Sequence, residues 1–174
     1  VGSVLRNPDL ADTYRLLRTE GLKAFYEGEI GQDVVDAVNA PPVDPAAERE
    51  VRPGGMTMAD LREYRTIERE PVHLEYRGLD VYGMAPGNSG GTTVGEALNI
   101  LEETDLSQVD QAEYLHRFLE ASKLAFADRN RWVGDPAFTE VPTEELVSTE
   151  FARSRECLIE ADAGLPAPVP AADP

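Results

Sequence analysis

The sequence predicts an α+β fold, in which a helix-rich fragment contributes one β-hairpin to a shared sheet. Apolar residues recur at helical spacing along most of the 174 residues. Only residues 72–84 alternate apolar and polar side chains, in two short runs. Because two strands alone do not form a stable sheet, we expect the hairpin to join strands supplied by other polypeptide.

The net charge of the chain limits the kinds of partner that it can bind. Lys and Arg total 16, Asp and Glu total 33, and the formal net charge is −17. Such a surface repels nucleic acid and anionic membranes, so we expect no nucleic-acid partner. We interpret the acidity as a solubility feature, with an acidic binding face as the alternative. No apolar run approaches the ~20 residues of a membrane span, and the start at Val1 suggests a fragment or processed piece.

The first forty residues predict two helices. Asn7 and Pro8 provide a cap and a first-turn proline, and Gly21 ends the first helix. The inward face of that helix is expected to carry three residues at helical spacing, Leu10, Tyr14 and Leu17. After a short turn, the second helix places Ile30, Val34 or Val35, and Val38 on one face.

Residues 41–55 are rich in proline and poor in apolar residues, which predicts a loop. A short helix follows from Thr57, whose pairing with Asp60 is a capping-box variant. We expect Leu61 and Tyr64 to face inward. The hairpin comes next, with strands over 72–76 and 79–84 and one buried face.

A glycine-rich turn, Gly87–Gly91, precedes the next helix. Free N–H groups at a helix start suit an anion, but the spacing matches neither the P-loop nor the dinucleotide fingerprint. We therefore favour a structural corner, in which Ser89 caps the helix while Gly90 and Gly91 allow close packing. The helix is expected to bury four residues, Val94, Ala97, Leu98 and Leu101.

The second half predicts a long helix ending near residue 132, an irregular connector and two short helices. Ser107 with Asp110 resembles the cap of the long helix. Its apolar stripe is expected to be Leu115, Phe118, Leu119, Ala125 and Phe126. We assign residues 1–160 to one domain and residues 161–174, rich in proline, to an extended tail that does not pack.

Three groups of polar residues are candidates for chemistry. Asp128, Arg129 and Asp135 favour an ion-pair corner, with Arg129 or Arg131 holding a carboxylate above Trp132, over a catalytic acid pair. His116 and Glu120 share a helix face, but a metal site needs a third ligand, so we expect a solvated pair, no metal and no cofactor. Cys157 is unpaired, and we expect it to pack as a small apolar residue.

Four stretches in order resemble the gamma-glutamyltransferase (gamma-glutamyltranspeptidase) family. They are "NPDLADTYRLLRTEGLKAFYEGEIG", "GGMTMADLREYRTIEREPVHLEYRGLDVYGMAP", "SGGTTVGEALNILE" and "FLEASKLAFADRNRWVGDPAF". The resemblance runs from Asn7 to about Ala152 and corresponds to the C-terminal half of the family's large subunit. Where the family commonly has Pro-Pro-Ser-Ser-Gly-Gly, Asn88 replaces the first serine, while Ser89 and both glycines remain.

The resemblance implies the N-terminal-nucleophile hydrolase fold, an αββα sandwich of two sheets between helical layers. It implies transfer or hydrolysis of the gamma-glutamyl group of glutathione and related amides. The nucleophile would be a threonine exposed by self-cleavage downstream of this chain. The fragment would then be an inactive scaffold without catalytic residues, its partners the remainder of its own precursor, and its place periplasmic or secreted.

Two alternatives remain. A related acylase of the same superfamily would act on cephalosporin side chains or on poly-gamma-glutamate. A non-enzymatic acidic helical module would instead bind a basic partner.

Overall fold

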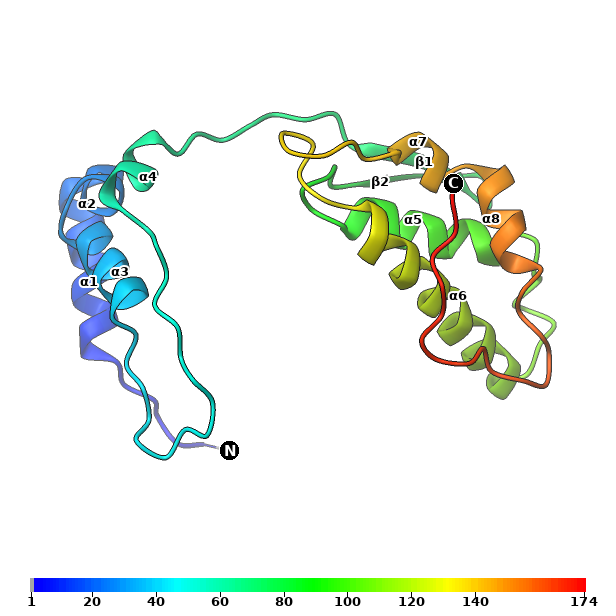
Figure 1. Cartoon of the computed structure of the whole chain (residues 1–174), viewed down its shortest axis with the longest axis horizontal. Helices are drawn as coiled ribbons and strands as arrows, with labels where there is room; N and C mark the ends of the chain where they lie inside the picture. Colours follow the sequence, from blue (N-terminus) through cyan, green and yellow to red (C-terminus); the bar gives the residue numbers. More distant parts are fainter. Residues whose placement is uncertain (1) are drawn as a thin grey trace. The chain divides into compact units, whose positions relative to one another are not determined.

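The computed structural model describes residues 2–174, and these fall into two compact units. The first unit ends at Ile67 and the second runs from Glu68 to Pro174. Figure 1 shows the helices and strands of each unit along the sequence. Each unit is described by itself below.

The first unit is helical. It contains α1 (Pro8–Glu20), α2 (Leu22–Tyr26), α3 (Glu29–Asn39) and α4 (Met58–Glu63). The start and stop signals of α1 are confirmed, because the Asn7 side chain accepts a hydrogen bond from Leu10 N at 3.0 Å and Gly21 has a positive φ of 67°. The residues expected to form the short turn with Phe25 instead complete a turn of helix, α2.

The first unit has a small core, to which Ala24 and Val35 contribute. The predicted inward face of α1 is open instead, since Leu10 and Tyr14 are exposed. Tyr64 was expected inside but is also exposed, because it lies just past the end of α4 and stacks on the Tyr26 ring at 5.9 Å between centroids. Little of this unit's apolar surface is therefore buried within it.

The capping box of α4 is confirmed. Asp60 N donates to Thr57 Oγ1 at 3.4 Å, and Thr57 N donates to Asp60 Oδ2 at 2.7 Å. The N–H and the hydroxyl group of Thr57 both donate to the Asp60 carboxylate and lower its pKa. Residues 41–55 form no helix or strand, as expected for a loop, and its end is attached to α3 by the bond from Gly54 N to Val38 O at 2.8 Å.

The second unit is layered. A hairpin of β1 (Val72–Tyr76) and β2 (Leu79–Gly83) packs on α5 (Gly90–Leu101), and α6 (Gln111–Trp132) and α8 (Thr149–Glu156) pack on α5 as well (Figure 1). The short helix α7 (Thr143–Leu146) contacts α5 and α8. The coarse prediction of a helix-rich α+β chain with a two-stranded hairpin is confirmed.

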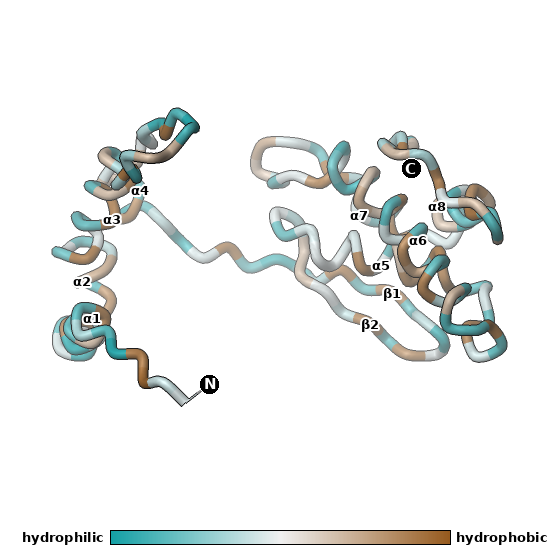
Figure 2. The backbone as a smooth tube through the Cα atoms, turned by 90° about the horizontal axis from the view of Figure 1, so that it is seen from below, coloured by the Kyte–Doolittle hydropathy of each residue, from teal (hydrophilic) through white to brown (hydrophobic). Residues whose placement is uncertain are grey.

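The hairpin is antiparallel, with Val72 opposite Gly83 and Tyr76 opposite Leu79. Its two-residue turn places Arg77 at φ 51° and Gly78 at φ 76°, the left-handed values that such tight turns require. The alternation of apolar and polar residues along both strands can be followed in Figure 2. Among the residues described, neither strand pairs with a third.

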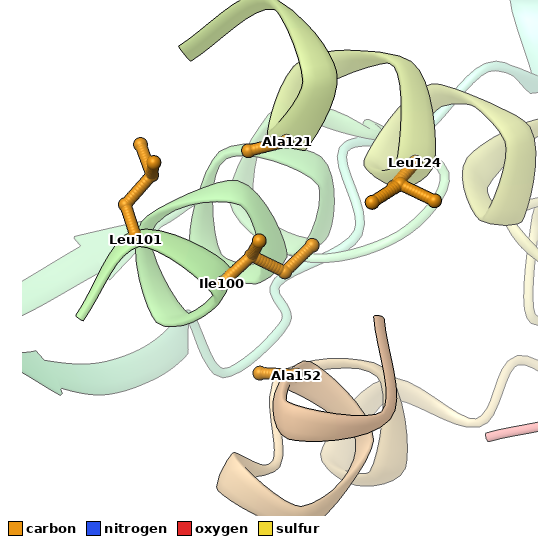
Figure 3. Packing of buried hydrophobic residues seen from close by; sticks show 5 residues of the cluster. All are labelled: Ile100, Leu101, Ala121, Leu124 and Ala152. Carbon is orange, nitrogen blue, oxygen red and sulfur yellow. The ribbon is translucent and has the colours of Figure 1, made fainter. Parts of the chain in front are cut away.

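The core of the second unit lies where α5, α6 and α8 meet. In Figure 3, Ile100 of α5 lies between Leu124 of α6 and Ala152 of α8. Leu101 and Ala121 complete the cluster. Three partly buried residues nearer the chain's end pack against it: Ile159, Leu165 and Val169.

The buried sides of α5 and α6 differ from those predicted. In α5, Val94 is exposed, and the buried side carries small and polar residues: Gly91, Thr92, Thr93, Gly95, Glu96, Ile100 and Leu101. In α6, four of the five predicted stripe residues are exposed, and the buried side is Glu120, Ala121, Leu124, Ala125 and Asp128. Small residues permit close helix packing, and they decide which side faces inward.

Three further expectations are corrected. Asp110 alone caps α6, accepting from Glu113 N at 2.9 Å, while Ser107 bonds to Asp105 instead. Cys157 is exposed, because it lies past the last turn of α8. Residues 161–174 were expected not to pack, yet they return along α6 and are hydrogen-bonded to it. No helix of the described chain is long and apolar enough to cross a membrane.

Candidate functional site

In the glycine-rich turn, Asn88 caps the N-terminus of α5. The Asn88 side chain accepts a hydrogen bond from Gly90 N at 2.7 Å, whereas the Ser89 side chain makes no capping hydrogen bond. The prediction that Ser89 caps α5 is therefore wrong, because Ser89 already has helical φ and ψ values and only the preceding side chain can reach the free N–H. Asn88, the residue that departs from the family pattern, supplies the cap.

Gly91 places α5 directly against the hairpin. A Cβ on Gly91 would overlap the Met84 carbonyl oxygen, and a Cβ on Gly83 would overlap the Gly91 backbone. One turn later, a Cβ on Gly95 would lie 2.8 Å from Leu74 Cδ2. Strand and helix backbones therefore touch at this corner, which supports the close-packing role for Gly91. A Cβ on Gly90 would meet only Asn88 Oδ1, at 2.9 Å, and no backbone atom.

A cluster of three ionisable side chains is buried where α5 meets α6 and α8. Glu96 of α5 is 1% exposed, Asp128 of α6 is 0% exposed and Arg155 of α8 is 4% exposed. Arg155 Nε lies 2.8 Å from Asp128 Oδ2. Three helices thus each contribute one ionisable group to the same closed space, where an unpaired charge would be costly.

The two carboxyl groups of this cluster cannot both be ionised cheaply. The pKa of Glu96 is raised to about 9 by burial, by the hydrogen bond to Asp128 and by the negative charge of Asp128. The Arg155 guanidinium offsets only part of this rise. At neutral pH Glu96 therefore holds a proton that it donates toward the Asp128 carboxylate. Within the described residues, Glu96 Oε1 and Thr93 Oγ1 have no hydrogen-bond partner.

This arrangement can hold a proton and join three helices, but it is sealed from substrate. The sequence contained one signal for it that the prediction missed, namely a single acidic residue, Glu96, within an otherwise apolar and small-residue helix. Its partners Asp128 and Arg155 lie 32 and 59 positions further along the chain, and no local pattern joins them.

The predicted corner of Asp128, Arg129 and Asp135 is not one cluster. Asp128 is held by Arg155, Arg129 Nη1 donates to Asn130 Oδ1 at 2.8 Å, and Asp135 pairs with Arg69 at 2.9 Å. Of the two arginines expected to hold a carboxylate, Arg129 does not, because consecutive helix residues such as Asp128 and Arg129 point to different sides.

Arg131 does pair with a carboxylate, that of Asp173, at 2.6 Å, and it also lies over the Trp132 ring.

His116 and Glu120 do not converge on a common point. His116 Nε2 contacts Glu160 O at 2.7 Å, whereas Glu120 is buried and accepts from Lys123 Nζ at 2.6 Å and Leu165 N at 2.9 Å. The description of both as a solvated pair is wrong for Glu120. Burial raises the pKa of Glu120, but these two donors outweigh it and the net shift is downward. Over residues 2–174, no group of three or more His, Cys, Asp or Glu side chains could hold a metal ion.

An apolar hollow of about 340 Å³ opens on the surface of α5 and α6. It is lined by several of the residues that were predicted to be core, among them Leu98, Leu101, Phe118 and Phe126. Phe118 is 45% exposed and Phe126 is 56% exposed. Such large aromatic side chains are rarely left open in a complete protein, so this face is a candidate interface.

Comparison with known proteins places these features in a family. The family model described as gamma-glutamyltranspeptidase matches residues 1–173. The chain belongs to the gamma-glutamyltranspeptidase family. The resemblance inferred from four ordered stretches is thereby confirmed, over a longer part of the chain than those stretches cover.

Among the similar proteins are proenzymes about four times as long as this chain. The glutathione hydrolase proenzyme of Escherichia coli (strain K12) is 34% identical over 155 residues, which cover 88% of this chain and 25% of the relative. The acylase ACY 1 proenzyme of Pseudomonas sp. (strain SE83) is 35% identical over 161 residues, covering 91% and 27%. The chain spans about a quarter of the length of these relatives.

Solved structures give the same result for the fold. The gamma-glutamyltranspeptidase of Helicobacter pylori has a TM-score of 0.76 and 30% identity, covering 95% of this chain and 45% of that one. A cephalosporin acylase from Bacillus halodurans has a TM-score of 0.73 and 31% identity, covering 92% and 28%. Both activities are therefore found among proteins that share this chain's fold.

Proposed function

We propose that this chain is part of a gamma-glutamyltransferase that transfers or hydrolyses the gamma-glutamyl group of glutathione and related amides. The observation that carries the proposal is the family match over residues 1–173, together with relatives that are glutathione hydrolase proenzymes. The reaction would proceed through a threonine acyl-enzyme, and the threonine would lie in polypeptide outside this chain.

The role of this chain in that enzyme is to support the site. Its most perturbed ionisable group, Glu96, is buried among helices and cannot reach a substrate. The hairpin lies on α5 with its backbone in contact at Gly83 and Gly91, and its strands pair only with each other in the described chain. In the proposed αββα sandwich, further strands from the same precursor extend this hairpin into a sheet.

The rest of the precursor is also the proposed partner for the apolar hollow on α5 and α6. Phe118 and Phe126 are already about half buried, so covering the remainder would contribute about half of the 1.5–3 kcal/mol that full burial of such a side chain gives. The hollow and the unextended hairpin belong to the same unit, so both indicate that this unit is completed by other polypeptide.

The test uses the complete precursor containing this chain. We expect it to cleave itself into two subunits, seen by gel electrophoresis and mass spectrometry, and to release the aniline from a gamma-glutamyl anilide. A precursor in which the proposed threonine is changed to alanine serves as the control and should do neither. A precursor that remains intact and inactive, with correct folding shown by circular dichroism, would contradict the proposal.

A second candidate is an acylase of the same superfamily. The cephalosporin acylase structure favours this candidate, because it is 31% identical to this chain while the gamma-glutamyltranspeptidase structure is 30% identical. Supplying the mature enzyme with a gamma-glutamyl anilide and a glutaryl-type cephalosporin in parallel separates the two. Turnover of the cephalosporin alone would favour the acylase.

A further inference from the structure

The segment 165–173 lies in a seat formed by side chains of α6 and α8. Figure 1 shows this last part of the chain, in red, running beside α6. We name as the seat the five side chains that hydrogen-bond to its main chain: Glu120, Lys123, Asp128 and Trp132 of α6 and Arg155 of α8. Arg131 of α6 also pairs with the side chain of Asp173.

Two residues of the segment are held at both their N–H and their C=O groups. Leu165 N donates to Glu120 Oε2 at 2.9 Å, and Leu165 O accepts from Lys123 Nζ at 3.4 Å. Seven residues later, Ala172 N donates to Asp128 Oδ1 at 2.6 Å, and Ala172 O accepts from Trp132 Nε1 at 2.7 Å. Both pairs of bonds recognise main-chain atoms and not side chains.

The stretch between these anchors suits main-chain recognition. It contains three prolines, which have no N–H group to satisfy, and Pro170 O accepts from Arg155 Nη2 at 3.0 Å. The side chain of Val169 packs against the core cluster, as does that of Leu165. Each proline ring restricts the backbone of its residue, so a segment with three prolines loses less freedom on being held than one without them.

The seat in turn depends on its occupant. Glu120, Asp128 and Arg155 are each at least 95% buried, so their charges have little access to water. The N–H and C=O groups of the segment replace that water. Removing the segment would open these side chains to water, so another main chain would have to replace that water with N–H and C=O groups at the same positions.

We propose that α6 and α8 form a binding site for the main chain of a proline-rich peptide, and that residues 165–173 are its resident occupant. The site is independent of the proposed enzymatic function. A peptide that binds this site needs free N–H and C=O groups at two positions seven residues apart. Prolines suit the positions between them, because proline has no N–H group. The resident segment competes effectively against free peptides because it is tethered to the same chain.

The first experiment breaks one anchor in the 174-residue chain. Ala172→Pro removes the N–H that Asp128 accepts, whereas Ala172→Gly keeps it and loses only a methyl group. Trp132, the sole tryptophan of the sequence, donates to the same residue and reports on the seat. We expect a red-shifted emission and stronger acrylamide quenching in Ala172→Pro, and neither change in Ala172→Gly. Equal emission in the two variants would overturn the proposal.

The second experiment supplies the occupant in trans. A fluorescein-labelled peptide with the sequence of residues 161–174 is added to each variant, and binding is followed by anisotropy. We expect saturable binding to Ala172→Pro, none to the unaltered chain at the same concentration, and none when the peptide itself carries proline at the position of Ala172. Binding that ignores this proline, or no binding to a helical Ala172→Pro chain, would overturn main-chain recognition.

Amide hydrogen exchange in the unaltered chain keeps the proposal testable if the proline variant loses its helical circular dichroism. The N–H groups of Leu165 and Ala172 should exchange far more slowly than those of the neighbouring exposed residues Ala161 and Ala163. Equal exchange rates at these four positions would show that the seat does not hold the segment in solution.

Discussion

Replacing Glu96 by glutamine should stabilise the protein, and should do so more strongly as the pH rises. Glu96 is 1% exposed and lies beside Asp128, so its carboxyl group is held in the protonated form, with a pKa of about 9. In the unfolded chain the same group has its ordinary pKa of 4.5 and is ionised at neutral pH. The folded protein therefore carries a proton that the unfolded chain releases.

The sign of the pH dependence follows from this difference. Between pH 4.5 and pH 9 the folded state binds more protons at Glu96 than the unfolded state, so the free energy of unfolding falls as the pH rises. The slope from this one group is about 1.4 kcal/mol per pH unit. At pH 7.5, three units above the ordinary value, the group costs about 4 kcal/mol, a large part of a typical domain stability of 5–15 kcal/mol.

Glutamine has the size of the protonated acid, can donate its amide N–H to Asp128 and does not titrate. We therefore expect Glu96→Gln to match the unaltered chain near pH 5 and to exceed it by up to about 4 kcal/mol at pH 7.5. Urea denaturation at pH 5, 6, 7 and 8 measures this. Emission from Trp132 reports on the same unit as Glu96, so the transition belongs to that unit.

Glu120→Gln is a matched comparison of opposite sign. Glu120 is likewise buried, on α6, but its hydrogen-bond donors lower its pKa. Its contribution to the free energy of unfolding is therefore present above the ordinary pKa of 4.5 and is lost as the pH falls. This substitution should destabilise the chain at pH 7 and have a smaller effect near pH 4. The reasoning about the cluster fails if Glu96→Gln is no more stable at pH 7.5, or if its advantage does not grow between pH 5 and pH 8.

Three further substitutions test the packing, each measured by urea denaturation followed by tryptophan emission. Gly91→Ala should lower the free energy of unfolding by about 1–3 kcal/mol because the new methyl group overlaps backbone, whereas Gly90→Ala should have a smaller effect. Asn88→Ala should cost about 1 kcal/mol through loss of the cap, and Ser89→Ala close to nothing; the reverse order would restore Ser89 as the cap. Leu124→Ala should cost about 2–5 kcal/mol, since Leu124 is 0% exposed, and a loss below 1 kcal/mol would show that the core closes around the gap.

Local features could be predicted because their causes lie within a few residues. The Asn7 cap, the end of α1 at Gly21 and the Thr57–Asp60 box are each set by a side chain or glycine acting on the adjacent backbone. The hairpin turn at Arg77 and Gly78 is local in the same sense. The family, too, could be recognised from the order of its sequence stretches.

The candidate site could be predicted only in part. The turn was placed correctly and its glycines were given a packing role that Gly91 supports, but the cap was assigned one residue too late. The buried cluster was missed, and Asp128 was given the wrong partner, because Arg155 comes from a helix that no short-range pattern connects to α6.

What the sequence determined by itself is where most helices, turns and strands begin and end, because hydrogen bonding and sterics over three or four residues control most of these boundaries. Only the tertiary structure decided which side of each helix is buried. Most of the large apolar residues of α6 lie open, whereas Leu124, Ala121 and the acids Glu120 and Asp128 face inward. Small side chains allow helices to approach closely, and a buried acid is stable only where distant donors, here Arg155 and the main chain of residues 165–172, reach it.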